Sequence, residues 1–483
     1  MLRHFDISRR VDPAYQMAIG LKEGMGPGGG GRIPAEVVKA LKRNSSSLLI
    51  KGMAGTGKTT LALTILRTFN LRNDFLYLST RASPSQVIND HPWLKDWLGN
   101  GDEAEKEARD PYLAPLFVDA RLDEPSQLFE KITNQLMDAR SPLIVVDAWD
   151  SLKELAKGEP LEADMRVLLA WCERAHAKLI VTGEDPRDVS LDALMDGVVV
   201  LSQKDREGGR LRELSLPKLR GIEIASPSYL FTLKGSIFRS FEQYRPEDCV
   251  AASSFSARRT RPKLLQGRYS TGFPELDSSL EGGIRAGSLV GLRLSPDVDP
   301  RAALILTGNI IAEFVRANRK IVIGSIDGID ERLMDGLLKG LIPRGKLKYV
   351  RHVPATKRDG ESGEPPETVG EESALVKALE ESEEPTLSIL GARIVGQRRN
   401  ARGLPLENLA KATRQSAGLG FIVSRGTERR TSEDLDGSVS IRMKVSSVNG
   451  TLVLQPGSMV SKLLAFDISR ESGTPILGLE SIE

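Results

Sequence analysis

The chain has 483 residues, a length that corresponds to roughly two to four domains. It is 40% hydrophobic and 27% charged, and its 67 basic and 65 acidic residues leave a net charge of +2, which argues against a protein that coats polyanions over its whole surface. Two cysteines and four histidines exclude a disulfide framework and argue against a Cys/His zinc site. No apolar run approaches the roughly 18 residues of a membrane span. We therefore expect a cytoplasmic protein with no membrane contact.

The first half of the sequence predicts an α/β domain. Residues 1–31 are expected to form a flexible arm, because 24–31 is a glycine-rich run. The domain that follows spans 32–250. Its expected strands are short aliphatic runs that alternate with helical stretches such as 164–176, and they lie at 47–50, 75–78, 115–118, 143–146, 179–181 and 198–201. Continuous aliphatic strands alternating with helices predict a mostly parallel sheet covered on both faces.

The second half repeats this outline after a basic linker at 251–266. Residues 251–268 hold five basic residues and no acidic residue. We expect a second α/β domain over 267–483, with a helix at 304–315 and strands at 287–290, 320–324, 386–390 and 421–424. Between 359 and 384 the sequence has ten acidic residues and one lysine, which predicts a solvated insertion. Two related α/β domains are the economical account of this pattern.

The strongest chemical signal is a phosphate-binding loop between an expected strand and an expected helix. The motif G-x-x-x-x-G-K-[ST] is matched by Gly52-Met53-Ala54-Gly55-Thr56-Gly57-Lys58-Thr59. Glycines let successive backbone N–H groups face a phosphate, and the following helix adds the positive end of its dipole. Lys58 is predicted to reach the β- and γ-phosphates, Thr59 to ligate Mg²⁺, and Thr60 to supply a second hydroxyl.

A carboxylate at the end of another strand completes the predicted site. Four aliphatic residues at 143–146 precede Asp147, and the carboxyl ends of parallel strands are where α/β proteins bind their ligands. Asp147 is therefore the expected partner of Thr59 in a magnesium site. These residues together predict a nucleotide site that requires Mg²⁺.

Residues 47–245 resemble the RecA/KaiC-type P-loop ATPases, and within them the P-loop domain of archaeal gas-vesicle regulators of the GvpD type. Besides the phosphate loop, the stretches that carry the resemblance are 77–81, 92–93, 146–147, 218–221 and 229–233. The resemblance implies ATP as the nucleotide, a RecA-like fold and a hexamer-like homo-oligomer. It also implies that Lys218 and Arg220 act on the γ-phosphate bound by a neighbouring subunit.

The resemblance also exposes a difference in the expected catalytic groups. KaiC-like enzymes carry a pair of glutamates after the second strand, where this sequence has Arg81 and Ala82. Because water-activating groups contribute roughly 10²–10⁴ in rate, we expect slow hydrolysis unless Asp119, Asp123 or Asp150 substitutes, with Asp119 the best placed. An alternative is that Arg81 senses the γ-phosphate.

The second domain resembles the same superfamily in a degenerate form. Its phosphate loop has become 294–301, with Pro300 and Arg301 at the Lys and Thr positions, and its Walker-B-like strand ends at Leu390-Gly391 without a carboxylate. We therefore expect no conventional ATP binding there. A loop after that strand holds Arg393, Arg398, Arg399 and Arg402, which form either a solvated basic loop or a contact with a DNA backbone.

These observations predict an ATP-binding, slow ATPase that acts as a nucleotide-controlled regulatory or assembly protein through protein partners. Two alternatives stay open. One is a RecA-paralogue accessory factor that binds DNA in recombination or repair. The other is an ATP-binding scaffold without turnover.

Overall fold

The computed structural model describes a defined part of the chain, namely residues 31–71, 74–99, 117–121, 123, 128, 130–132, 134, 136, 141–156, 161–206, 209–248, 267–342, 344–353, 384–392, 395, 406–426, 439–457, 462–469 and 476–482. These residues form two compact units, one running to Ser202 and including Glu213–Ser240, the other including Gln203–Arg212 and the chain from Phe241 onward. The predicted linker and nearly all of the predicted arm and acidic insertion lie outside the described residues. The predicted domain boundaries at 250 and 266 therefore stay predictions.

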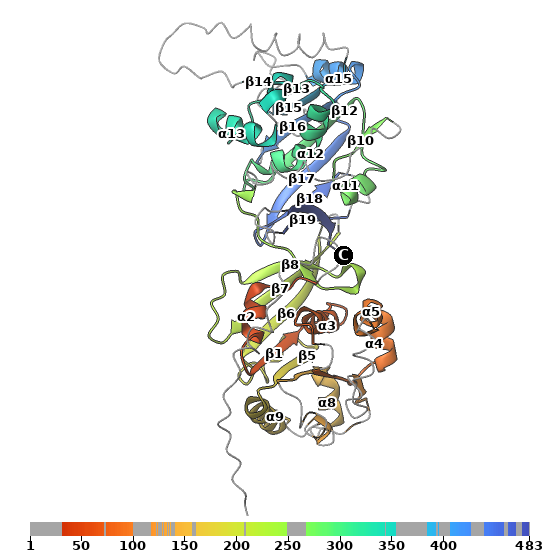
Figure 1. Ribbon diagram of the computed structural model, residues 1–483, viewed down its shortest axis with the longest axis vertical. Coiled ribbons are helices and arrows are strands. Elements are labelled where there is room, and N and C mark those ends of the chain that lie inside the picture. Colours follow the sequence, from red (N-terminus) through yellow and green to blue (C-terminus); the bar gives the residue numbers. More distant parts are fainter. Residues whose placement is uncertain are drawn as a thin grey trace, which may run out of the picture. The chain divides into compact units, whose positions relative to one another are not determined.

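The first unit is built on a nine-stranded sheet with the order β3-β2-β4-β5-β1-β6-β7-β8-β9. Figure 1 labels β1, β5, β6, β7 and β8 among its strands. The pairs among β3, β2, β4, β5, β1 and β6 are parallel, whereas β7–β8 and β8–β9 are antiparallel. The strands are β1 Ser46–Lys51, β2 Phe75–Ser79, β3 Phe117–Asp119, β4 Leu143–Asp147, β5 Lys178–Gly183, β6 Gly197–Arg206, β7 Gly209–Leu219, β8 Ser228–Thr232 and β9 Arg239–Ser240.

Helices cover both faces of this sheet because its central strands are apolar on both sides. Alternate residues of a strand point to opposite faces. Leu48 and Ile50 of β1 therefore pack in one apolar cluster with α2, α3, α4 and α5, and Leu49 packs in another with α8 and α9. The helices are α2 Ala35–Leu41, α3 Lys58–Thr68, α4 Pro84–Asp90, α5 Trp93–Gly99, α8 Trp149–Leu155, α9 Glu162–Ala175 and the 3-10 turn η1 Lys234–Ser236.

The second unit has its own nine-stranded sheet, of order β14-β13-β15-β16-β12-β17-β18-β19-β20, and a separate β10–β11 pair. Its strands are β10 Arg268–Tyr269, β11 Ile284–Arg285, β12 Ser288–Leu294, β13 Ile321–Gly324, β14 Val350–Val353, β15 Leu387–Gly391, β16 Leu419–Arg425, β17 Ile441–Val448, β18 Thr451–Pro456, β19 Leu464–Ser469 and β20 Ile476–Ser481. Its helices are α11 Pro274–Ser279, α12 Ala302–Arg316, α13 Glu331–Leu341, η3 Arg344–Tyr349 and α15 Leu406–Gln415.

The two sheets share one strand order. Counted from the first strand of each, both read 3-2-4-5-1-6-7-8-9, with the same parallel pairs around the first strand. In both units the first strand leads into a buried helix, α3 in one and α12 in the other. The predicted fold class, two related α/β domains with mostly parallel central sheets, is confirmed.

Membrane-spanning helices are not found in the part of the chain that the structure describes. None of its helices is both long enough and apolar enough to cross a bilayer.

Candidate nucleotide-binding site

The predicted phosphate loop lies between β1 and α3, at the carboxyl edge of the parallel strands. Gly57 ends the loop with φ 99°, a left-handed conformation that favours glycine. At Gly52 a Cβ atom would lie 2.6 Å from both the Leu201 carbonyl oxygen and Thr56 Oγ1. Thr56 Oγ1 in turn donates to the Met53 carbonyl at 2.8 Å, which fixes the curl of the loop. The glycine spacing of the motif is therefore required by the backbone path itself.

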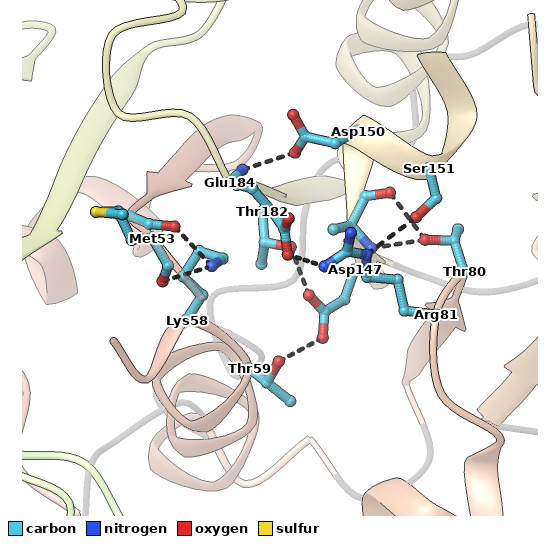
Figure 2. Close-up of polar contacts among 12 residues, drawn as sticks. Met53, Lys58, Thr59, Thr80, Arg81, Asp147, Asp150, Ser151, Thr182 and Glu184 are labelled. Carbon is cyan, nitrogen blue, oxygen red and sulfur yellow. Dashed lines mark hydrogen bonds and ion pairs between the residues drawn. The ribbon is translucent and has the colours of Figure 1, made fainter. Parts of the chain in front are cut away.

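Lys58 opens α3 and turns back into this loop. Its Nζ donates to the Gly52 carbonyl at 2.6 Å and to the Met53 carbonyl at 3.1 Å (Figure 2). Burial lowers the pKa of the Lys58 ammonium, and the nearby carboxylates of Glu184, Asp147 and Asp150 oppose this effect.

The start of α3 fits a phosphate group. The N-cap residue Gly57 provides no side-chain hydrogen bond to the first helical amides, and these amides have no acceptor within a helix. A buried ammonium and a helix N-terminus therefore share one concave loop, and this donor set suits the phosphates of a nucleotide.

Asp147 ends β4 and is surrounded by hydroxyl groups. Thr59 Oγ1 donates to its Oδ2 at 2.7 Å, Thr182 Oγ1 donates to its Oδ1 at 2.5 Å, and the Tyr77 hydroxyl also donates to Oδ2. Burial raises the pKa of Tyr77 well above its ordinary value, and the Asp147 charge adds to this effect. The peptide bond from Asp147 to Ala148 is cis.

The pair formed by Thr59 and Asp147 fits Mg²⁺. A hydroxyl and a carboxylate are hard oxygen donors, and sites of this kind take one or two protein ligands together with phosphate oxygens and water. Among the described residues no group of three or more His, Cys, Asp and Glu side chains could hold a metal ion by itself. The two side chains would therefore hold Mg²⁺ jointly with a bound phosphate.

Thr60 follows these residues but its side chain has another partner. Its hydroxyl lies 3.1 Å from His91 Nε2, and His91 Nδ1 lies 2.9 Å from the Val87 carbonyl at the end of α4. All of these contacts are buried. The Thr60 hydroxyl thus ties α3 to α4 and does not turn into the phosphate loop.

Arg81 lies after β2, beside the site, and is held by two partners. Its guanidinium forms an ion pair with Glu184, the residue after β5, and its Nε donates to Ser151 Oγ at 3.3 Å (Figure 2). Asp150 Oδ2 accepts a hydrogen bond of 2.6 Å from the Glu184 backbone amide. An arginine and two carboxylates therefore border the region between Lys58 and Asp147.

Two of the three carboxylates expected to replace the missing glutamates lie elsewhere. Asp119 pairs with Arg121 at 2.6 Å, and β3, which it ends, is separated from β1 by three strands. Asp123 pairs with Lys131 at 2.7 Å. Of the three, only Asp150 lies close enough to Lys58 to affect its pKa.

Lys218 and Arg220 have partners outside the phosphate loop of their own chain. Arg220 pairs with Asp196 at 3.0 Å, and Lys218 Nζ donates to the Asp192 carbonyl at 2.7 Å. The Asp196 carboxylate also accepts from Ser47 at the start of β1. The phosphate loop follows the other end of β1, which places Arg220 away from it. Lys218 lies nearer the loop, because Asp192 also pairs with Lys51, the last residue of β1.

The second unit lacks this site for reasons that its structure makes plain. After β12, the Arg301 guanidinium contacts the Asp299 carboxylate at 2.8 and 2.7 Å. Pro300 and Arg301 stand at the positions that the lysine and the threonine occupy in the first unit. Gly391 ends β15, the strand equivalent to β4, and a Cβ atom there would lie 2.2 Å from the Ser325 carbonyl oxygen. A side chain at the position that Asp147 occupies in the first unit would therefore require the backbone at Ser325 to move.

Three residues of the site were missed by the sequence analysis as functional groups, namely Tyr77, Thr182 and Glu184. A weak signal exists for the first two, because each is a hydroxyl residue within a mostly apolar strand. Glu184 carries no signal in the sequence. The arginines at 393, 398, 399 and 402, predicted to form either a solvated basic loop or a DNA contact, lie outside the described residues.

Comparison with known proteins agrees with this geometry. Residues 40–217 match the family model described as GvpD gas vesicle protein, P-loop domain. This part of the chain is similar to the P-loop domain of the GvpD gas vesicle proteins. The chain is also similar to Protein GvpD1 of Halobacterium salinarum, with 31% identity over 284 residues, which are 56% of this chain and 51% of that protein. Protein GvpD2 of the same organism is 28% identical over 283 residues, 56% of each chain. The alignments therefore span about half the length of these curated relatives.

Proposed function

We propose that the chain binds ATP with Mg²⁺ at its GvpD-like domain and hydrolyses it slowly, as a nucleotide-controlled regulatory or assembly protein. The observation that carries this proposal is the contact of 2.7 Å between Thr59 and Asp147, beside the buried Lys58 in an intact phosphate loop. When bound, Mg²⁺ would neutralise phosphate charge during transfer. Lys58 and the α3 amides would hold the phosphates, and Asp147 with Thr59 would hold the metal.

Slow turnover follows from the groups around the phosphate loop. Arg81 stands where KaiC-like enzymes carry a carboxylate, and the Glu184 carboxylate nearby is paired with it. With no carboxylate at that position, the group that would take a proton from the attacking water is missing. The same feature favours the second candidate, an ATP-binding scaffold without turnover.

The test is phosphate release by the full chain with Mg²⁺ and ATP, compared with Lys58→Ala. Slow release that requires both Lys58 and Mg²⁺ supports the ATPase. ATP binding without release supports the scaffold, and binding that survives Lys58→Ala contradicts the site itself.

We also propose that the active form is a homo-oligomer in which Lys218 and Arg220 reach the nucleotide of a neighbouring chain. The support is that both have partners outside the phosphate loop of their own chain, since Arg220 pairs with Asp196 and Lys218 donates to the Asp192 carbonyl. Engaged arginine fingers contribute roughly 10³–10⁵ in rate. Mixing Lys58→Ala with Arg220→Ala should restore partial activity, because some interfaces then join an intact loop to an intact finger. Co-assembly of the two variants without restored activity would contradict the shared site.

A further inference from the structure

The ion pair between Arg81 and Glu184 is not explained by the binding and metal roles assigned above. Arg81 is 47% exposed and Glu184 is 28% exposed, and ion pairs that solvent reaches contribute little to stability. Arg81 and Ser151 come from different elements, and Glu184 from a third. The ion pair adds little stability, and Arg81, its partner Glu184 and Ser151 come from three different elements at the edge of a phosphate site. Such a pair is better suited to exchanging partners than to holding the fold together.

The strand order places this pair across the site. Along the sheet the strands run β2, β4, β5, β1. Arg81 follows β2 and Glu184 follows β5, so the ion pair passes over the end of β4, where Asp147 lies. Figure 2 shows the Glu184 carboxylate drawn between the Lys58 ammonium and the Arg81 guanidinium.

Two observations place Glu184 close to the lysine that would hold the terminal phosphates. Gly183, the residue before Glu184, accepts a hydrogen bond of 3.1 Å from the Gly52 amide, and Lys58 Nζ donates to the Gly52 carbonyl. Among the charged groups that act on the pKa of Lys58, Glu184 has the largest effect. A phosphate held by Lys58 would therefore lie near the Glu184 carboxylate, and like charges at such short range repel.

From this arrangement we infer that Arg81 and Glu184 discriminate ATP from ADP. Arg81 binds the γ-phosphate, and Glu184 competes for Arg81 until that phosphate arrives. The inference rests on the proposed function, because it assumes that the phosphate loop binds a nucleotide. Guanidinium groups favour phosphate because their planar donors match two of its oxygens at once. A doubly charged γ-phosphate is the stronger anion, so Arg81 exchanges partners when ATP binds, and ADP leaves the pair with Glu184 intact.

The two members of the pair then have opposite effects on binding, which a structural ion pair would not. Removing Arg81 removes a charge-assisted contact to the γ-phosphate, and ATP affinity should fall roughly 10- to 100-fold. Removing the Glu184 charge removes a weak competitor, and ATP affinity should rise by about two- to fivefold. ADP affinity should change less than ATP affinity in both cases.

The experiment is calorimetric titration of the full chain with Mg²⁺ and either ADP or the slowly hydrolysed analogue adenosine 5′-(β,γ-imido)triphosphate. The variants are Arg81→Ala, Arg81→Lys and Glu184→Gln, with Arg121→Ala as the matched control, because Arg121 forms an exposed ion pair outside the site. We expect the ratio of the two affinities to fall in Arg81→Ala, to recover in part in Arg81→Lys, to rise in Glu184→Gln and to stay unchanged in the control.

Each other outcome is informative. Weaker analogue binding in Glu184→Gln, in parallel with Arg81→Ala, would mark the pair as structural and overturn the inference. An unchanged affinity ratio in Arg81→Ala, with both nucleotides bound, would overturn the inference and leave the proposed function standing. If the unmodified chain binds neither nucleotide, the proposed function and the inference both fail.

Discussion

Replacement of Thr182 by valine tests whether the hydroxyl groups around Asp147 hold its carboxylate. Thr182 is fully buried at the end of β5, and valine keeps its shape while removing the hydroxyl. Among the described contacts, Oδ2 of Asp147 accepts from both Thr59 and Tyr77, whereas Oδ1 accepts from Thr182. The substitution therefore leaves Oδ1 without that donor. Hydrogen bonds to charged groups contribute about 1.5–3 kcal/mol, and we expect the first unit to lose that amount of unfolding free energy.

Unfolding of the first unit can be followed separately within the full chain. All four tryptophans, at 93, 97, 149 and 171, belong to the first unit, so their fluorescence during urea unfolding reports its transition. The contribution of the hydrogen bond is isolated by a double-mutant cycle with Asp147→Ala. Thr182→Val should cost about 1.5–3 kcal/mol in the unmodified chain and well under about 1 kcal/mol once Asp147 is absent. An equal cost in both backgrounds would refute the reasoning.

Three further outcomes follow from the structure. Burial lowers the pKa of Lys58 from its ordinary 10.5, so as pH rises the ammonium should lose its proton, and ATP affinity should begin to decrease, before pH 10.5 is reached. Lys58→Met should bind ATP weakly at every pH. A decrease that begins only above pH 10.5 in the unmodified chain would count against a buried lysine. Gly52→Ala should abolish nucleotide binding, because its Cβ would lie 2.6 Å from the Leu201 carbonyl oxygen, whereas Gly336→Ala, with open space around it, should bind normally in the same titration. Burial raises the pKa of the Cys172 thiol to about 12, so iodoacetamide should label Cys172 only after denaturation, as read by peptide mass spectrometry; labelling of the folded chain would contradict its burial.

The sequence was sufficient to predict the parts of the site that lie within a single local pattern. The aliphatic runs at 48–50 and 143–146 predicted two buried strands, β1 and β4. The phosphate loop and Asp147 follow directly from the ends of those strands. The contact between Thr59 and Asp147 also needs the loop and the strand to meet at one edge of the sheet, which a parallel α/β fold ensures.

The residues that were missed depend on which strands are neighbours. Tyr77 reaches Asp147 because β2 pairs with β4, with Ser79 opposite Asp147. Thr182 and Glu184 reach the site because β5 lies between β4 and β1. Strand order is a long-range property of the fold, and no local pattern in the sequence records it. The same limit applies to Asp119, which ends a strand as expected but a strand at the edge of the sheet.

In the second unit, too, some features could be predicted from the sequence and others are seen only in the structure. Its degenerate loop and its missing carboxylate could be seen in the sequence at Pro300, Arg301 and Gly391. Only the structure shows that Arg301 is held by Asp299 and that a side chain at Gly391 would require the backbone at Ser325 to move. The antiparallel strands β18 to β20 were not predicted, and neither were β7 to β9 in the first unit.

The central claim is that one nucleotide site exists per chain and that it lies at Lys58. Calorimetric titration of the full chain with Mg²⁺ and adenosine 5′-(β,γ-imido)triphosphate measures this directly. The account predicts one binding site per chain, lost in Lys58→Ala and retained in Arg301→Ala, which alters the equivalent loop of the second unit. Two sites per chain, or undiminished binding by Lys58→Ala, would contradict it.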